Sequence, residues 1–163
     1  MGFEALYDNA SVRRRDRLLS AEEAAGVLRR GEYGFLAMQD AGDGAYGVPI
    51  SYVWDGGSRI YLHCAPEGRK LSCLERHPEV TFCVVGATHV VGRKFTTAYE
   101  SVILRCRAVV GPDEEERWKA LDLLLRKYPP GMSKRGACMP KSRSTARRSS
   151  GSKSSPQAAS ASG

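Results

Sequence analysis

Hydrophobic and polar positions alternate along much of the chain, which is the pattern of half-buried β-strands. In Tyr46–Trp54 the bulky residues occupy every second position, and a turn cluster at 40–44 separates this run from the compact apolar run Tyr33–Met38. A second turn at 55–58 leads into Arg59–Cys64, whose composition again favours a strand. Three successive strands joined by short turns predict an antiparallel meander.

Two further strands are expected downstream. The runs Val80–Val85 and Tyr99–Val110 are apolar and rich in β-branched residues, and the glycine-containing stretch Gly86–Phe95 connects them. Pro49 lies within the second of the earlier runs, where it removes a ladder hydrogen bond, so it predicts either an edge strand or a β-bulge. A bulge would expose backbone groups to a ligand, whereas an edge strand needs no function.

Two short segments carry helical signals. Ser20 and Glu23 have the spacing of a capping box, and the apolar residues that follow have helical spacing, which predicts a helix at 21–30. A second short helix is expected within Gly68–Arg76, because its leucines are three residues apart and Pro78 stops the segment.

A longer helix is expected after Asp113. This residue is a good N-cap, and the acidic residues that follow it suit the positive end of a helix. The apolar residues of this helix that fall on one face are Trp118, Leu121, Leu124, Leu125 and Tyr128. We expect that face to be the buried one.

Composition divides the chain into three parts. The 163 residues are 42% hydrophobic and 26% charged, which fits one globular domain. From Met132 onward the sequence loses periodicity and becomes rich in Ser, Ala, Gly and basic residues, so we expect a disordered tail at 132–163. A polar arm at 1–17 and a folded domain at 18–131 complete the predicted organisation.

The formal net charge of +7 belongs to the tail. Seven of the 25 basic residues lie beyond Gly131 without any acid, so the remaining 18 basic residues face 18 acidic ones. Such a tail would bind nucleic acid non-specifically and with a steep salt dependence, and no recognition helix is visible. We therefore expect no specific nucleic-acid partner.

The cysteines and histidines indicate no metal site. Five cysteines form no CxxC pair and three histidines are scattered among them, so a zinc site would need ligands from distant segments. No run approaches the ~20 apolar residues of a membrane span, and no apolar leader follows the N-terminus. These features predict a cytoplasmic protein with reduced thiols and no membrane association.

One segment combines a histidine with two cations. His63 lies at the end of the third predicted strand, and after a turn Arg69 and Lys70 begin the second predicted helix. Free backbone N–H groups at a helix start, together with Arg and Lys, form a good phosphate site. On the residues alone, the alternative is that Arg69 and Lys70 are solvated surface charges.

Five segments in one order resemble the pyridoxamine 5′-phosphate oxidase-like flavin proteins, and within them the Nim-type nitroimidazole-resistance branch. The segments are Val48–Val53, Ile60–Ala65, Gly68–Leu71, His77–Phe82 and Tyr99–Ile103. The resemblance covers roughly Arg13 to Tyr128. It implies a mainly β fold, an antiparallel split β-barrel with flanking helices, that forms a homodimer with FMN at the subunit interface.

The family pattern also assigns residues to FMN. These residues are Val48, Pro49, Ile50, Ser51, Leu62, His63, Arg69, Lys70, Tyr99 and Ser101. The backbone of Val48–Ser51 is expected along the flavin ring, with Leu62 and His63 flanking it. If Pro49 marks a bulge, that bulge would free an N–H to face the flavin.

Two further groups of contacts follow from the resemblance. Arg69 and Lys70 are expected to hold the phosphate, and the strand Tyr99–Val102 is expected to complete the site from the other subunit. His63 corresponds to the histidine of the Nim-type YFH motif, so it is a candidate catalytic proton donor beside the flavin. Its alternative role is packing at a strand end.

The implied activity is an oxidoreductase that passes electrons from a nicotinamide donor through FMN to a small acceptor such as a nitroaromatic. The alternative is a non-catalytic module that binds flavin or haem, with His63 or His89 as an axial ligand. Neither reading follows from the fold alone, because one fold carries many functions.

The C-terminal part departs from the family pattern. Family members usually continue past the last helix with another strand, whereas no strand pattern follows Gly131 here. Either the tail has diverged or a different segment fills the place. A missing strand would expose apolar surface and an unpaired edge, with consequences for dimerisation and FMN affinity.

Overall fold

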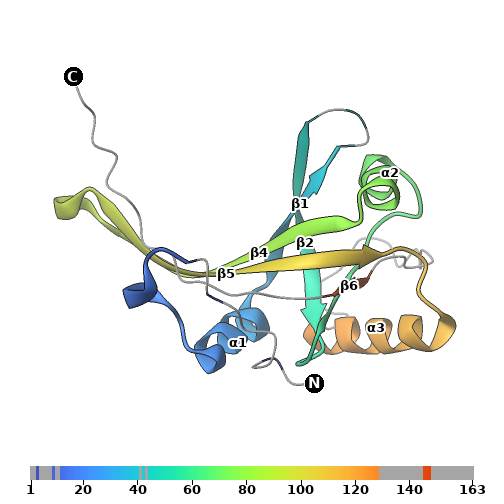
Figure 1. Cartoon of the computed structure of the whole chain (residues 1–163). Coiled ribbons are helices and arrows are strands. Elements are labelled where there is room, and N and C mark those ends of the chain that lie inside the picture. The colour runs from blue at the N-terminus through green and yellow to red at the C-terminus, as the bar shows by residue number, and fades with distance from the viewer. Residues whose placement is uncertain are drawn as a thin grey trace.

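Six antiparallel strands form a closed barrel in the order β1-β2-β3-β6-β5-β4 (Figure 1). The computed structural model describes residues 3, 9, 12–40, 42 and 44–128, together with the backbone of 145–147. The strands are β1 (Tyr33–Gln39), β2 (Ala45–Trp54), β3 (Arg59–Leu62), β4 (Glu79–Val91), β5 (Thr96–Val109) and β6 (Thr145–Arg147). The helices are α1 (Ala21–Arg30), α2 (Arg69–Arg76) and α3 (Glu114–Lys127). The predicted mainly β split barrel with flanking helices is confirmed.

The predicted meander is present as β1, β2 and β3. β1 pairs with β2 in one continuous register from Tyr33 opposite Ser51 to Gln39 opposite Ala45. β2 then pairs with β3 through its last residues only, beginning with Tyr52 opposite Leu62. Because β3 is four residues long, the earlier part of β2 has no strand on its second side within the described part of the chain.

Pro49 marks an edge and not a bulge. It lies opposite Phe35 in the uninterrupted β1–β2 register, in the part of β2 that β3 does not reach. Of the two predicted alternatives, the structure has the edge strand, where a proline without an N–H breaks no ladder hydrogen bond. The register irregularity lies instead in β4, between Val85 and Thr88.

β4 and β5 form one long hairpin. β4 does not end at Val85, as the sequence suggested, but continues to Val91, and β5 begins opposite it at Thr96. The ribbon extends beyond the barrel as an arm (Figure 1). The connection at its tip includes Phe95, whose φ of 45° is left-handed. Thr88, Val90 and Val91 on β4 and Thr96 and Thr97 on β5 are β-branched, which favours extended backbone despite Gly86.

The barrel is closed by a strand that the sequence did not predict. β6 pairs with β3 on one side and with β5 on the other. Three residues are too few to show an alternating pattern, and this strand is specified by the unpaired backbone groups of its two neighbours. The expectation of no strand after Gly131 was therefore wrong at 145–147. The other residues of the predicted tail lie outside the described ranges.

The core fills the barrel and continues into α1. Phe82, Val84 and Leu104 are almost fully buried and belong to one cluster with Val27 and Leu28 of α1. The predicted boundaries of this helix and its capping box are confirmed. Burial of about ten such side chains is the main stabilising contribution to a domain of this size.

α3 packs on the outside of the barrel through a narrow stripe. Ala120 is buried, and Leu123 and Leu124 pack beside it. Trp118 and Leu125, which we expected on the buried face, are 62% and 50% exposed. The predicted buried face of α3 was wrong because the barrel contacts the helix only through the small surface of Val53 and Tyr61. Most of the helix surface therefore faces solvent.

The described residues bear on thiol chemistry, metal binding and membrane association. Cys64, Cys73 and Cys106 are buried, and Cys83 is half-buried. Within the described ranges, no three His, Cys, Asp or Glu side chains are grouped to hold a metal ion. No helix in that part of the chain is long and apolar enough to cross a membrane.

Candidate functional site

The open edge of β2 carries the segment predicted to lie along the flavin ring. Val48 and Ile50 point into the barrel, where Ile50 is buried, and Pro49 and Ser51 are exposed on the outside. Because β3 starts to pair only at Tyr52, the backbone of this segment remains accessible from its second side. Accessible strand backbone offers both donors and acceptors to a planar ligand.

The start of α2 lies beside the β1–β2 hairpin. Gly68 precedes the helix with a φ of 123°, a conformation that glycine adopts without strain. The next residue, Arg69, donates from Nε and Nη2 to the two carboxylate oxygens of Asp40 at 3.1 and 2.6 Å. Its guanidinium also lies over the ring of Tyr46, 4.3 Å from the centroid. These contacts place Arg69, the first of the two predicted phosphate-binding residues, beside Tyr46 near the start of β2.

Leu62 and His63 complete this side of the site. Leu62 is buried and pairs with Tyr52, so it lies level with the end of the open edge. His63 follows directly and is exposed. Leu62 thus neighbours the end of the open edge of β2, and Arg69 contacts the beginning of that edge through Tyr46.

Tyr99 and Ser101 are not part of this cluster. Both lie on β5, and β1 and β4 separate that strand from β2. Three strand spacings amount to about 14 Å, so these residues do not touch the backbone of Val48–Ser51 within one chain. Tyr99 is half-buried opposite Thr88, and Ser101 is buried. Their assignment to the second half of a shared site remains a prediction.

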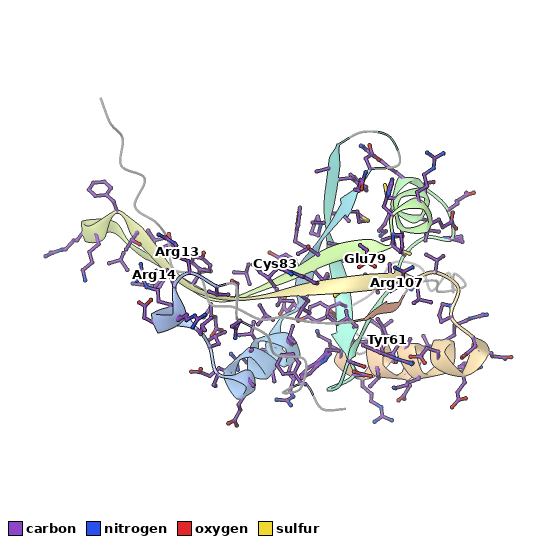
Figure 2. All side chains as sticks on the ribbon, in the orientation of Figure 1. Arg13, Arg14, Tyr61, Glu79, Cys83 and Arg107 are labelled. Atoms are coloured by element: carbon purple, nitrogen blue, oxygen red, sulfur yellow. The ribbon has the colours of Figure 1, made fainter. Side chains whose placement is uncertain are left out.

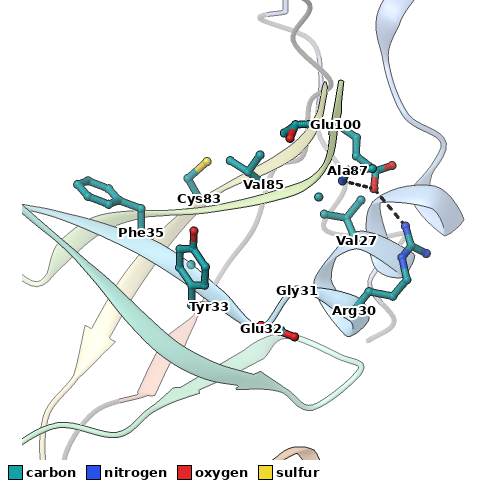
Figure 3. A pocket seen from close by; sticks show the side chains of 13 residues that line it. Val27, Arg30, Gly31, Glu32, Tyr33, Phe35, Cys83, Val85, Ala87 and Glu100 are labelled. Atoms are coloured by element: carbon teal, nitrogen blue, oxygen red, sulfur yellow. Dashed lines mark hydrogen bonds and ion pairs between the residues drawn. The ribbon is translucent and has the colours of Figure 1, made fainter. Parts of the chain in front are cut away.

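A groove of about 560 Å³ lies between these two groups of residues (Figure 3). It is lined by Val27, Arg30, Gly31, Glu32, Tyr33, Gly34, Phe35, Cys83, Val85, Gly86, Ala87, Thr88 and Glu100. None of the residues predicted for FMN is among them. However, Tyr33 pairs with Ser51 on one side, and Val85 pairs with Ser101 on the other. Within one chain, the groove therefore lies between β2's Val48–Ser51 segment and the Tyr99–Ser101 segment of β5.

The groove has a polar end. Glu100 accepts hydrogen bonds from Arg30 Nη2 at 3.2 Å and from the backbone N–H of Ala87 at 3.1 Å (Figure 3). A Cβ on Gly86 would lie 2.2 Å from Glu100 Oε1, so the Glu100 side chain would have to shift to accept one. The irregularity between Val85 and Thr88 opens this part of β4 to the carboxylate.

The opposite end of the groove joins an apolar surface that we call the outer face. It is a row of neighbours across four strands, formed by Pro49, Phe35, Cys83 and Ile103. Phe35 and Ile103 are 47% and 37% exposed, and burial raises the pKa of the half-buried Cys83 thiol. Contiguous exposed apolar surface is typical of protein interaction sites.

The sequence contained one signal for the groove and the outer face that our interpretation did not use. The run Tyr33–Met38 is apolar at inward and outward positions alike. Leu36 and Met38 face the core, whereas Tyr33 and Phe35 face outward. A strand that is apolar on both faces indicates that something covers each of them.

The sequence profile of the pyridoxamine 5′-phosphate oxidase family matches residues 20–161. The chain belongs to this family. The match spans all six strands and all three α-helices, including the three-residue strand in the tail. None of the curated proteins matches the chain significantly.

Solved structures of family-like barrels resemble this chain. A protein from Bacteroides thetaiotaomicron with a provisional assignment to 5-nitroimidazole antibiotic resistance superimposes with a TM-score of 0.64 at 20% identity, covering 86% of this chain and 82% of that one. An FAD-binding protein from Mesorhizobium loti gives 0.62 at 25% identity, covering 86% and 98%. An FAD- and haem-binding protein from Mycobacterium smegmatis gives 0.64 at 17% identity, covering 86% and 75%. These similarities agree with the split-barrel fold.

Proposed function

We propose that this family member binds FMN at the interface of a homodimer and transfers electrons from a nicotinamide donor to a small acceptor such as a nitroaromatic. The observation that carries the proposal is the position of Arg69 beside the open edge of β2. The cationic helix start can bind a phosphate, and the accessible strand backbone beside it can bind the edge of a planar ring.

The phosphate end of the proposed site is built from Arg69, Lys70 and the first N–H groups of α2. Arg69 uses Nε and Nη2 for Asp40, and within the described residues its Nη1 has no hydrogen bond. That side of the guanidinium is suited to a phosphate oxygen. Lys70 adds a second cation that no ion pair in the described part of the chain engages.

The second half of the proposed site comes from a partner subunit. The outer face supplies a contiguous apolar surface that a second copy would cover, with Phe35 and Cys83 at its centre. In their own chain, Tyr99 and Ser101 are separated from β2 by β1 and β4. In a two-fold dimer the same surface is used by both copies, so each β5 can approach the partner's β2 edge.

His63 is the proposed proton donor. It is exposed at the end of β3, next to the open edge along which the flavin ring is expected. Bound flavin supplies the redox chemistry, and an imidazole at this position can deliver a proton to the acceptor as it is reduced. The named properties of the structural relatives, flavin binding and nitroimidazole resistance, agree with this proposal.

The experiment is anaerobic reduction followed by reoxidation. Protein loaded with FMN is mixed with NADPH or NADH, and the loss of the oxidised flavin spectrum is recorded before a nitroimidazole is added. We expect reduction by a nicotinamide and reoxidation by the nitro compound, with His63→Gln slowing the second step about tenfold or more. Bound flavin that no donor reduces would favour the non-catalytic module, and a sharp Soret band in the purified protein would identify haem.

A further inference from the structure

Asp40 connects the β1–β2 hairpin to the proposed phosphate site. It follows the last residue of β1, and its backbone N–H donates to Gly44 O at 3.1 Å, which fixes it in the hairpin turn. Its side chain is only 21% exposed. The Cys73 thiol from α2 donates to Oδ1 at 3.4 Å, so the carboxylate is held from the helix as well.

Arg69 forms a bidentate ion pair with Asp40. Nε and Nη2 reach separate carboxylate oxygens, an arrangement that fixes the plane of the guanidinium as well as its position. Tyr46 restrains one face of that plane at 4.3 Å. The remaining edge of Arg69, which includes Nη1, has no partner within the described ranges and can receive an oxyanion. The Arg69 side chain is 59% exposed, so it would be mobile without these two contacts.

We propose that Asp40 is a positioning residue that holds Arg69 ready for the flavin phosphate. The inference rests on the proposed function, since it concerns the same phosphate site. A long arginine side chain loses rotamer freedom when it binds a ligand, and this loss lowers affinity unless the side chain is already ordered. Asp40 orders Arg69 before the ligand arrives. The opposing effect, repulsion between Asp40 and the phosphate, acts through solvent and is screened by salt.

The test compares FMN with riboflavin, which has the same ring and no phosphate. Affinities for both are measured by flavin fluorescence quenching at about 0.3 M salt, where the Debye length is only about 6 Å and the through-solvent repulsion is small. We expect Asp40→Asn to weaken FMN binding about tenfold and to leave riboflavin affinity unchanged. Asp40→Glu, which keeps a carboxylate, is expected to restore most of the FMN preference.

A double variant tests whether Asp40 acts through Arg69. In an Arg69→Ala background, which itself weakens FMN binding, Asp40→Asn should have no further effect on FMN affinity. Glu79→Gln is the control, because it removes another ion pair of the same length, Arg107 to Glu79 at 2.6 Å, at the end of the β4–β5 ladder opposite the arm (Figure 2). It should change neither affinity.

The outcomes separate the inference from the proposed function. An unchanged ratio of FMN to riboflavin affinity in Asp40→Asn would overturn the positioning role, and so would an equal loss of both ligands, which would indicate a structural role. Wild-type protein that binds riboflavin as tightly as FMN would refute the phosphate site while leaving flavin binding intact. Wild-type protein that binds neither would refute the proposed function and the inference with it.

Discussion

Phe35 and Cys83 lie directly opposite each other on β1 and β4, and both side chains point out of the barrel. They occupy the centre of the outer face, and the Phe35 ring extends over Gly47 on β2, where an added Cβ would come within 2.4 Å of it. This outer face is the surface that we assign to the homodimer.

The first prediction concerns that assembly. Phe35→Asp places a charge at the centre of the outer face, so we expect the variant to be a monomer, because an unpaired buried charge costs several kcal/mol at an interface. Size-exclusion chromatography with light scattering measures the mass. Phe95→Ser is the control, since Phe95 is 94% exposed at the tip of the β4–β5 arm. Wild-type protein that is itself monomeric at micromolar concentration would rule out the assignment.

The second prediction concerns a lysine beneath α3. Lys127 Nζ lies 3.7 Å from the centre of the Tyr52 ring, is buried, and has no hydrogen-bond partner within the described part of the chain. Burial lowers the pKa of Lys127 from its ordinary value of 10.5 to about 8. We therefore expect Lys127→Met to raise the free energy of unfolding by about 1 kcal/mol at pH 7, because solvent screens part of the cost of burying the ammonium charge.

The stability difference between Lys127→Met and wild type should become smaller as the pH rises. Between pH 8 and 10.5 the unfolded wild-type chain keeps the Lys127 proton and the folded chain has lost it, so wild-type stability rises with pH in this window. The advantage of Lys127→Met should narrow over the same range. Urea unfolding at pH 7, 9 and 10 measures it, and an advantage that stays constant would contradict the buried-charge explanation.

The third prediction concerns the attachment of α3. Tyr61 points from the barrel toward α3 (Figure 2), where its hydroxyl donates to the Glu116 carboxylate, and Arg59 forms an ion pair with the same group. The hydrogen bond from Arg59 is the largest cause of the lowered pKa of Glu116. We expect Glu116→Gln to lower the free energy of unfolding by about 1 kcal/mol at pH 7.

A carboxylate whose pKa is lowered in the folded state stabilises the fold at pH values above its pKa in the unfolded chain. It loses that effect as the pH falls. The difference between wild type and Glu116→Gln should therefore shrink below pH 4.5. Asp122→Asn is the control, because Asp122 pairs with Arg126 on the exposed side of the same helix. This control should lower stability by less than about 0.5 kcal/mol at pH 7. Equal losses in the two variants would show that Glu116 has no special role.

The fourth prediction concerns packing inside the barrel. A Cβ on Gly34 would lie 2.3 Å from Phe82 Cζ and 2.9 Å from the carbonyl oxygen of Cys83. Gly34→Ala should therefore destabilise the protein by about 1–3 kcal/mol through overpacking. Gly42→Ala, where nothing lies within 4 Å, is the matched control and should change stability by less than about 0.5 kcal/mol. Chemical denaturation measures the free energy of unfolding of both variants. Equal stabilities would contradict the close packing of Gly34 against Phe82.

Local patterns in the sequence were sufficient for most of the barrel. The alternation in Tyr46–Trp54 and the capping box at Ser20 predicted β2 and α1 within a residue of their observed limits. Both signals depend on short-range physics, one on the pleat of a strand and the other on unsatisfied N–H groups at a helix start. The family resemblance supplied the way in which these elements close into a barrel.

Features that depend on long-range pairing could not be read from the sequence in the same way. The strand at 145–147 exists because two distant edges leave a gap, and the stripe on α3 is set by the small surface that receives it. The link between Arg69 and Asp40 joins residues 29 positions apart, and no spacing rule connects them. The sequence placed Leu62 beside the end of β2 and Arg69 at the start of α2, whereas the groove beside β1 was found only in the structure.

One measurement tests the central claim most directly. The purified protein is incubated with FMN, excess flavin is removed by gel filtration, and the absorption of the eluted protein is recorded together with its mass, alongside an Arg69→Ala, Lys70→Ala double variant. The proposal predicts that flavin elutes with a dimer in wild-type protein, about one per chain, and is largely lost from the double variant. Flavin that separates completely from wild-type protein, or that the double variant retains equally well, would contradict it.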